Sequence, residues 1–241
     1  MSSILSRIGV SWRDAVRDII LIVVSILIAF ALDAWWNDQL DRQRERAHLE
    51  TLLAEFQVNH DRIAGYLRQV NDSFDSTLQV LALMGPTPKG ISADLLTSLI
   101  NESFDVGTYT PHGGAVAALL ASGELSLIEN RELSAMLSQW PVVSNTLHDL
   151  AQLQARNREE LHIYLARSGV PVSRIAENLG WLDIPRSKFN FDPDKVLGDV
   201  GIETYLVSRA VRIGFLRDQY TAALNNADAI ITLLKKDLSS R

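Results

Sequence analysis

The sequence predicts an all-α protein in which one N-terminal transmembrane helix continues into an elongated antiparallel helical bundle. One apolar run, residues 19–32, has no polar face and is followed by charged sequence. Two further stretches, residues 49–81 and 206–238, repeat apolar side chains in alternating steps of four and three, the heptad pattern of packed helices. No run alternates apolar and polar residues as a half-exposed strand would.

These patterns divide the chain into three parts. We expect residues 1–14 to form an N-terminal tail or an interfacial helix, because Ile4, Ile8 and Trp12 share one helical face. Residues 15–36 should form the transmembrane helix and residues 37–241 an all-helical soluble domain. The soluble part, roughly 200 residues, is ample for a hydrophobic core.

The apolar run reads IILIVVSILIAFAL, and only Ser25 interrupts it. At about 1.5 Å per residue it spans about 21 Å, less than a hydrocarbon core of about 30 Å. A helix over residues 15–36 spans about 33 Å. Its eleven Ile, Leu, Val and Phe residues favour insertion by about 3 to 7 kcal/mol, whereas one central aspartate costs about 2.5 to 3.5 kcal/mol. Insertion is therefore the prediction.

Five residues flank this run and are expected at the membrane interface. Arg17 can extend its charge to the headgroups beside Asp18, and Asp33 precedes the pair Trp35 and Trp36, whose rings suit the water boundary. Aspartates near a membrane helix can also line an ion path when several copies assemble. A channel role for the two aspartates therefore stays open.

Two other interpretations of the run also stay open. A cleaved signal peptide is one, because Ala29-Phe30-Ala31 has the A-x-A form of a cleavage site and arginines precede the run. A buried helix of a soluble protein is the other, because about 14 apolar residues also occur in core helices.

The orientation rests on a nearly balanced count of arginines. Arginines at positions 7, 13 and 17 precede the run, and arginines at positions 42, 44 and 46 follow it. The free amino terminus tips the balance slightly toward a short inner tail. We expect the C-terminal domain to lie outside, in a periplasm-like compartment.

Composition excludes several classes of function. The net charge is −6, the isoelectric point is about 5.4, and no basic stripe is interleaved with aromatic residues, so we expect no nucleic-acid partner. The chain has no cysteine, which excludes disulfides, thiolate zinc sites and a cysteine nucleophile.

The first heptad stretch begins shortly after the membrane run, and the charged segment between them lacks Gly and Pro, so one helix should continue from the membrane to about Met84. The sequence GPTPKG then forms a turn. His60 should be a packed, hydrogen-bonded core residue, with a ligand role as the less favoured alternative. The predicted core positions are Leu49, Leu53, Phe56, His60, Ile63, Leu67, Val70, Phe74, Thr77 and Leu81.

Shorter helices follow, each marked by its terminal residues. Ser92 should cap a helix through about Phe104, with Leu95, Leu96, Leu99 and Ile100 on its apolar side. Pro111 should open a small-residue helix that a left-handed Gly123 ends.

A longer helix should begin after Asn130, a good N-cap, and run to about Ser168 with a kink or an interruption near Pro141. We expect another short helix over residues 172–180 and an irregular stretch over residues 181–201. Within that stretch Asp192-Pro193-Asp194 should open one or two helical turns.

The last helix should cover residues 202–238 and carry the second heptad stretch, with Arg217 as the lone charge among its core positions. Each long helix needs a partner for its apolar stripe. Antiparallel packing with the helix after Asn130 satisfies both stripes in one bundle.

Two segments resemble a known family. The membrane segment DIILIVVSILIAFALDAWWND and the later segment LLASGELSLIENREL are similar to those of the uncharacterised bacterial DUF6090-type single-pass membrane proteins. Ser25 stands where that family commonly has glycine, and Ala121 replaces its first serine. The resemblance covers roughly the first 140 residues. It implies a bacterial inner-membrane protein that retains its anchor, which disfavours the signal peptide, and it implies no activity.

The sequence offers little for catalysis or metal binding. None of the five histidines lies in a metal-binding motif, so we predict no metal, no cofactor and no catalytic residue. Tyr109, His112 and Glu124 form the one candidate pocket, because His112 lies in a loop beside Gly113-Gly114. We expect these glycines, like Ser122-Gly123, to mark helix ends and not a phosphate or nucleophile loop.

We therefore expect a non-enzymatic, membrane-anchored helical interaction or sensory module of the bacterial envelope. It should bind the lipid bilayer, associate with itself and act on an unknown protein partner, because the chain contains no recognisable output domain. The alternative is an oligomeric channel or transport accessory that uses Asp18 or Asp33. An enzyme with a site near His112 is the third and least favoured reading.

Overall fold

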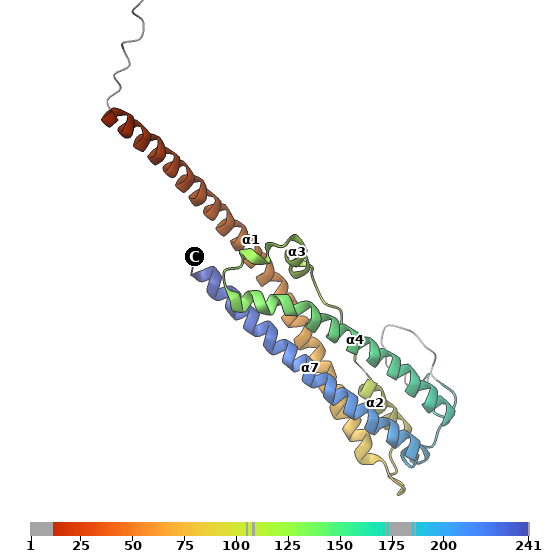
Figure 1. The fold of residues 1–241 in the computed structure, drawn as a ribbon. Helices are drawn as coiled ribbons and strands as arrows, with labels where there is room; N and C mark the ends of the chain where they lie inside the picture. The colour runs from red at the N-terminus through yellow and green to blue at the C-terminus, as the bar shows by residue number, and fades with distance from the viewer. Residues whose placement is uncertain are drawn as a thin grey trace, which may run out of the picture. The chain divides into compact units, whose positions relative to one another are not determined.

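The computed structural model describes residues 12–104, 106–107, 109–171, 173, 185 and 187–240. These residues form an all-α protein, and the described ranges contain no strand (Figure 1). The predicted fold class is thereby confirmed. The chain divides into two compact units, Met1–His48 and Leu49–Arg241, and each is described by itself.

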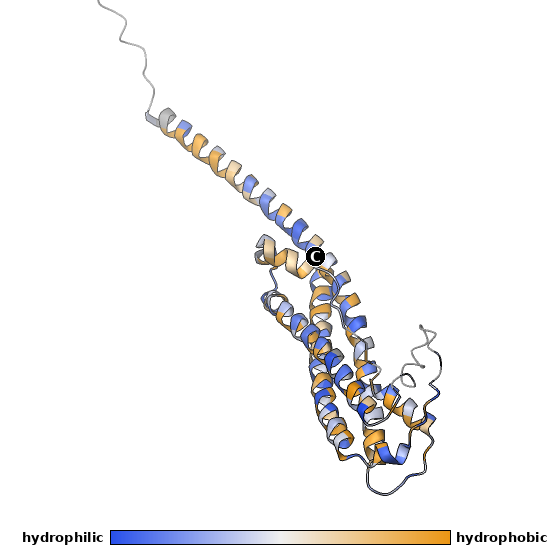
Figure 2. Ribbon diagram, turned by 90° about the vertical axis from the view of Figure 1, so that its right-hand side faces the viewer, coloured by the Kyte–Doolittle hydropathy of each residue, from blue (hydrophilic) through white to orange (hydrophobic). Residues whose placement is uncertain are grey.

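In the first unit the described residues belong to helix α1, Trp12–Leu83, whose later part lies in the second unit. α1 is the one helix of the described chain that is long and apolar enough to span a membrane. The large apolar side chains of residues 19–32 are exposed, from 44% for Val24 to 68% for Phe30. Figure 2 shows this part of α1 as a hydrophobic stretch. The expected tail or interfacial helix lies outside the described residues up to residue 11.

In the second unit, three long helices pack against one another (Figure 1): α1 from Leu49, α4 (Arg131–Arg167) and α7 (Val200–Ser239). His60 of α1 contacts Asp228 of α7, whereas Phe74, further along α1, contacts Arg217. Contacts that run in opposite order mean that α1 and α7 are antiparallel. The shorter elements are α2 (Ala93–Phe104), α3 (Ala115–Ser122), the 3₁₀ helix η1 (Glu124–Leu127) and α6 (Pro193–Leu197).

Two apolar clusters form the core of this unit. The larger lies among α1, α3, α4 and α7 and includes the rings of Phe56 and Trp140, which are tilted by 57° with centroids 4.8 Å apart. The smaller joins α2, the end of α4, α6 and the start of α7 around Leu96, Leu165 and Ile202. Together they bury apolar side chains along most of the unit, the main stabilising term of such a bundle.

The buried face of α1 matches every second predicted position, from Leu49 to Thr77, and is shifted by one residue at the positions between them. Asn59 is 1% exposed and Tyr66 5%, whereas His60 is only partly buried and its ring lies 3.1 Å from Asp61 and 3.2 Å from Asp228. His60 is therefore hydrogen-bonded as predicted, but its predicted place in the core is wrong. The reason is that α1 is covered on more than one side, so the position before the predicted stripe also becomes buried.

The charged residue inside the α7 core is likewise a different one. Arg209 is 5% exposed, and its Nε donates to the carbonyl of Ser103 at 3.0 Å while its guanidinium lies 4.0 Å from the Phe104 ring centroid. Arg217, the predicted core charge, keeps a side chain that is 42% exposed and rests over Phe74. A carbonyl and an aromatic face both stabilise a buried guanidinium.

Most helix ends follow the predicted caps. Ser92 Oγ accepts from the amide of Leu95 at 3.2 Å, and Asn130 Oδ1 accepts from the amides of residues 132 and 133 at 3.1 Å. Gly123 has φ of +75°, and Asp192 caps α6. α7 starts at residue 200, two residues before its predicted start, because Asp199 supplies the N-cap. Leu95, expected on the apolar side of α2, is 50% exposed.

α4 runs through Pro141 without an interruption. A proline in a helix interior costs about 3 kcal/mol. Trp140 packs on Phe56, and Leu137 and Leu147 are at most 1% exposed, so packing on both sides of the proline outweighs that cost. The expected short helix over 172–180 lies outside the described residues, apart from residue 173.

Candidate functional site

The membrane-flanking residues are exposed at both ends of the apolar stretch. Arg17 Nε lies 3.6 Å from Asp18 Oδ1, and both side chains are more than 60% exposed. Asp33 accepts a hydrogen bond from Asn37 Nδ2 at 3.4 Å within the same helix. Trp35 and Trp36 are exposed, with ring centroids 6.5 Å apart. Charges and indole rings thus bracket the apolar side chains on one helix.

The three residues of the predicted pocket are not gathered in one place. Tyr109 is 3% exposed and lines a cavity. His112 is exposed, and Glu124 lies on η1, where it accepts from the Ser122 hydroxyl at 3.3 Å. Neither of these two residues belongs to the lining of the cavity at Tyr109.

Tyr109 and His112 lie on a segment that crosses one face of α1, and we call its described residues between 106 and 115 the strap. Four α1 side chains bind its backbone. Gln69 Oε1 accepts from the Gly107 amide at 3.0 Å, and Arg62 Nη1 donates to the Thr110 carbonyl at 3.3 Å. Residues three, four and seven apart share a helix face, so α1 holds the strap with one polar face.

Asn59 forms the central contact of this face. Its Nδ2 donates to the carbonyl of His112 at 3.0 Å, and its Oδ1 accepts from the amide of the same residue at 2.9 Å. The buried amide thereby satisfies a donor and an acceptor with a single peptide segment. The His112 imidazole takes no part in this pair.

Glu55 forms the last contact and fixes where α3 begins. Its Oε2 accepts from the amides of Gly114 and Ala115 at 2.8 and 2.6 Å. A carboxylate at a helix N-terminus satisfies orphan amides and the helix dipole. Gly113 has φ of +90°, and a Cβ there would overlap the carboxylate. α3 therefore begins at Ala115, and the prediction that Pro111 opens it is wrong.

The strap and α1 line an open cavity of about 330 Å³. It lies where the strap crosses from Arg62 to Gln69, and Gly65, midway between them on α1, has no side chain to fill the gap. Gly107 on the strap also lacks a side chain, and a Cβ there would lie 3.0 Å from Gln69 Oε1. The lining residues are Arg62, Gly65, Tyr66, Gln69, Gly107, Tyr109 and Thr110.

Three tyrosines meet behind this cavity. The Tyr109 ring lies edge-on to Tyr220 at 5.4 Å between centroids, and Tyr66 lies 4.6 Å from Tyr220. Burial raises the pKa of Tyr109 to about 12, against the opposing effect of the Arg62 charge. Burial also raises the pKa of Tyr220, whose hydroxyl donates to the Leu147 carbonyl at 2.9 Å. The phenols of Tyr109 and Tyr220 therefore stay neutral at physiological pH.

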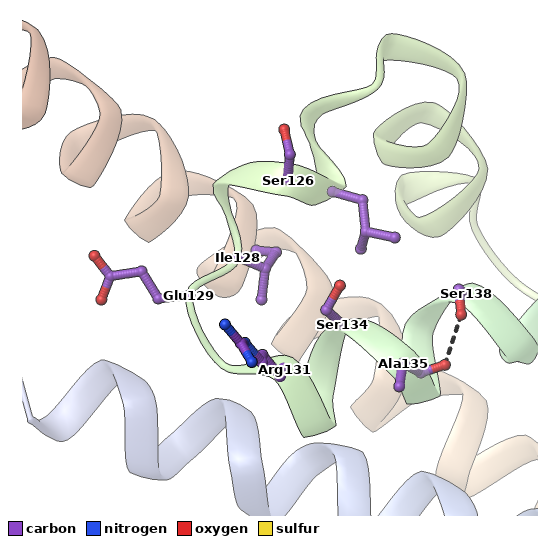
Figure 3. Close-up of a pocket in the computed structure, with 8 residues that line it drawn as sticks. Ser126, Ile128, Glu129, Arg131, Ser134, Ala135 and Ser138 are labelled. Carbon is purple, nitrogen blue, oxygen red and sulfur yellow. Dashed lines mark hydrogen bonds between the residues drawn. The ribbon is translucent and has the colours of Figure 1, made fainter.

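A second cavity, of about 500 Å³, lies between η1 and the start of α4 (Figure 3). Ser138 Oγ donates to the Ala135 carbonyl at 2.7 Å, so this hydroxyl is already engaged. Figure 3 shows the Glu129 carboxylate directed away from Ser134 and Ser138, so the lining does not assemble a nucleophile with a base. Among the described residues, no group of three His, Asp or Glu side chains could hold a metal ion.

No family model, no curated protein and no solved structure matches this chain. The resemblance to DUF6090-type proteins therefore stays a prediction. Its later segment has structural tasks in this fold: Gly123 ends α3, Asn130 begins α4 and donates to Asp237 of α7 at 3.1 Å, and Leu133 is fully buried.

Sequence reasoning missed Glu55, Asn59, Arg62 and Gln69. Their spacing along one helix face was a usable signal, because polar residues beside an apolar stripe can bind a neighbouring segment. The glycine-rich strap was recognised as a loop. The pairing between the two could not be predicted, because it joins residues roughly 40 to 60 positions apart.

Proposed function

We propose that this chain is a single-pass membrane protein of the bacterial inner membrane whose helical domain is a non-enzymatic interaction or sensory module in the periplasm. One observation carries the proposal: an apolar stretch of α1, interrupted only by Ser25, is exposed, with charges and tryptophans at its ends. Exposed Ile, Leu and Phe side chains are stabilised by about 1.5 to 3 kcal/mol each when they leave water. A bilayer supplies that environment along the whole stretch.

A retained anchor is favoured over a cleaved signal peptide. The A-x-A tripeptide, residues 29–31, lies inside helix α1, which continues to Leu83. Cleavage there would remove the apolar stretch from a helix that also carries the strap contacts. One helix therefore carries both the apolar stretch and the side chains that bind the strap.

Extraction of membranes at alkaline pH tests the anchor. The full chain should stay in the membrane pellet, and Leu21→Arg combined with Leu27→Arg should release it to the supernatant. Gln39→Arg with Gln43→Arg adds the same charge at exposed positions outside the apolar run and should leave the chain in the pellet. Equal extraction of the two double variants would contradict the proposal.

The orientation can be tested because the chain has no cysteine. Ser239→Cys places a single thiol at an exposed position near the C-terminus. A membrane-impermeant maleimide should label it in spheroplasts. Labelling only after lysis would place the domain on the cytoplasmic side.

Self-association completes the proposal, because a membrane helix followed by a helical bundle suits signalling through an oligomer. Cross-linking in native membranes should yield dimers or larger species, and monomers alone would refute this part. The channel alternative predicts that Asp33→Asn changes ion flux in reconstituted vesicles. The hydrogen bond from Asn37 to Asp33 fits an interfacial position, so we expect unchanged flux.

A further inference from the structure

The cavity under the strap offers hydrogen-bond donors and positive charge. Arg62 donates to Thr110 from one guanidinium nitrogen, and its other N–H groups have no partner among the described residues. Gln69 uses only its Oε1, which leaves its amide N–H groups available. No lining residue is acidic. Such a lining is complementary to a ligand with a carboxylate at one end and an acceptor at the other.

The shape of the cavity favours a flat ligand body. Gly65 and Gly107 both line it without side chains, and a Cβ at Gly65 would meet only Arg68 Nη2, at 3.7 Å. Tyr66 and Tyr109 contribute aromatic surface. Arg62 and Gln69 are two helical turns apart, about 10 Å along α1. The volume of about 330 Å³ lies at the lower end of small-molecule sites.

We propose that this cavity binds a small aromatic carboxylate, with Arg62 holding the carboxylate, the ring lying against Gly65, and Gln69 donating to an acceptor on the far side of the ring. The inference rests on the proposed sensory role and names the class of its ligand. A guanidinium matches a carboxylate with two parallel N–H donors, which makes Arg62 the anchor of the site.

Such a ligand would add contacts between two segments that already meet through hydrogen bonds and through the ring contact of Tyr109 with Tyr66. It would contact α1 through Arg62 and Gln69 and the strap through Gly107 and Thr110. A ligand that binds both segments stabilises the arrangement in which they are together. Ligand binding would thereby stabilise the contact between the strap and α1, the helix that carries the apolar stretch.

A ligand-observed NMR titration of the full chain in detergent micelles tests the site, with 4-hydroxybenzoate as the probe and empty micelles as the blank. A probe of about ten non-hydrogen atoms should bind with a dissociation constant on the order of 1 mM. The neutral analogue 4-hydroxybenzyl alcohol should bind at least about tenfold more weakly, because it lacks the charge-assisted pair. Inorganic phosphate should also bind more weakly, because it lacks the ring.

Two variants locate the binding. Arg62→Ala should weaken the probe by at least about tenfold, and Gly65→Leu should abolish binding by filling the cavity while it favours the helix. Arg212→Ala, which removes an exposed charge from α7 outside the lining, should leave binding unchanged. Circular dichroism of each variant establishes that the helices are intact.

Three results would overturn the inference: no binding to the unaltered chain, equal binding of the acid and the alcohol, or binding that survives Gly65→Leu. The comparison of the two probes needs no variant and therefore holds even if a variant misfolds. The membrane extraction described above uses no ligand. If the titration shows no binding while the chain stays in the membrane pellet, only the ligand proposal fails. If the probe binds but the chain is released from the membrane, only the membrane proposal fails.

Discussion

Removing the Glu55 carboxylate should open the junction between the strap and α3. Its Oε2 accepts two backbone amides, at 2.8 and 2.6 Å. A hydrogen bond to a charged group contributes about 1.5 to 3 kcal/mol, and loss of a helix cap costs about 1 kcal/mol. Because the two amides share one carboxylate and regain water when it is lost, we expect Glu55→Ala to cost about 2 kcal/mol. Glu55→Gln keeps an acceptor oxygen and should cost about 1 kcal/mol.

Hydrogen exchange measures this loss where it occurs. A cost of 2 kcal/mol for local opening should speed exchange of the amides of Gly114 and Ala115 about 30-fold, and a cost of 1 kcal/mol about fivefold. Mass spectrometry of a peptide covering 110–122 reads these amides. Asp72→Asn, which neutralises an exposed carboxylate elsewhere on α1, is the control and should change nothing in this peptide. Unchanged exchange in both Glu55 variants would refute the proposed cap.

Three further predictions follow from close contacts and burial. Gly113→Ala should lower the thermal midpoint by at least about 4 °C, because it adds backbone strain at φ of +90° and a clash with the Glu55 carboxylate. Gly114→Ala has open space around its Cβ and should lower the midpoint far less. Equal midpoints for the two variants would contradict this. Gly201→Ala should destabilise the chain by overlap with the Tyr164 hydroxyl, and Tyr164→Phe should restore part of the loss in the same melt; no rescue would point to the backbone instead. Burial raises the pKa of Tyr109 to about 12 in the folded state, from about 10 when unfolded, so its contribution to stability is complete below pH 10 and is lost as pH rises toward 12. Denaturation measured over a pH series should therefore show a smaller alkaline loss of stability for Tyr109→Phe than for the unaltered chain. An identical loss in both would refute this.

The helices and most of their ends were predictable because local rules decide them. Ser92, Asn130 and Asp192 cap helices as their side-chain chemistry requires, and Gly123 ends one with positive φ. The heptad steps also located α1 and α7 correctly. Such signals depend on residues within about four positions of one another, which is the range that a sequence pattern displays.

The predictions failed where distant residues decide the outcome. His60 was expected in the core, yet Asn59 is the buried residue because the strap covers its side of α1. Pro111 was expected to open a helix, yet Glu55, far away along the chain, sets the start of α3. Of the residues that line the cavity, only Tyr109 was predicted as a pocket residue, because most of the others lie on α1, far away in the sequence.

The Asn59 side chain hydrogen-bonds the backbone of residue 112, and the imidazole of His112 takes no part in these two bonds. A substitution at position 112 that keeps the backbone amide hydrogen should therefore keep both hydrogen bonds to Asn59. Proline would remove the amide hydrogen that Asn59 Oδ1 accepts. In a chain without cysteine, His112→Cys would give a single exposed attachment point for a fluorophore on a firmly held backbone. The label would report movement of the strap, because the side chain at position 112 takes no part in the hydrogen bonds to Asn59.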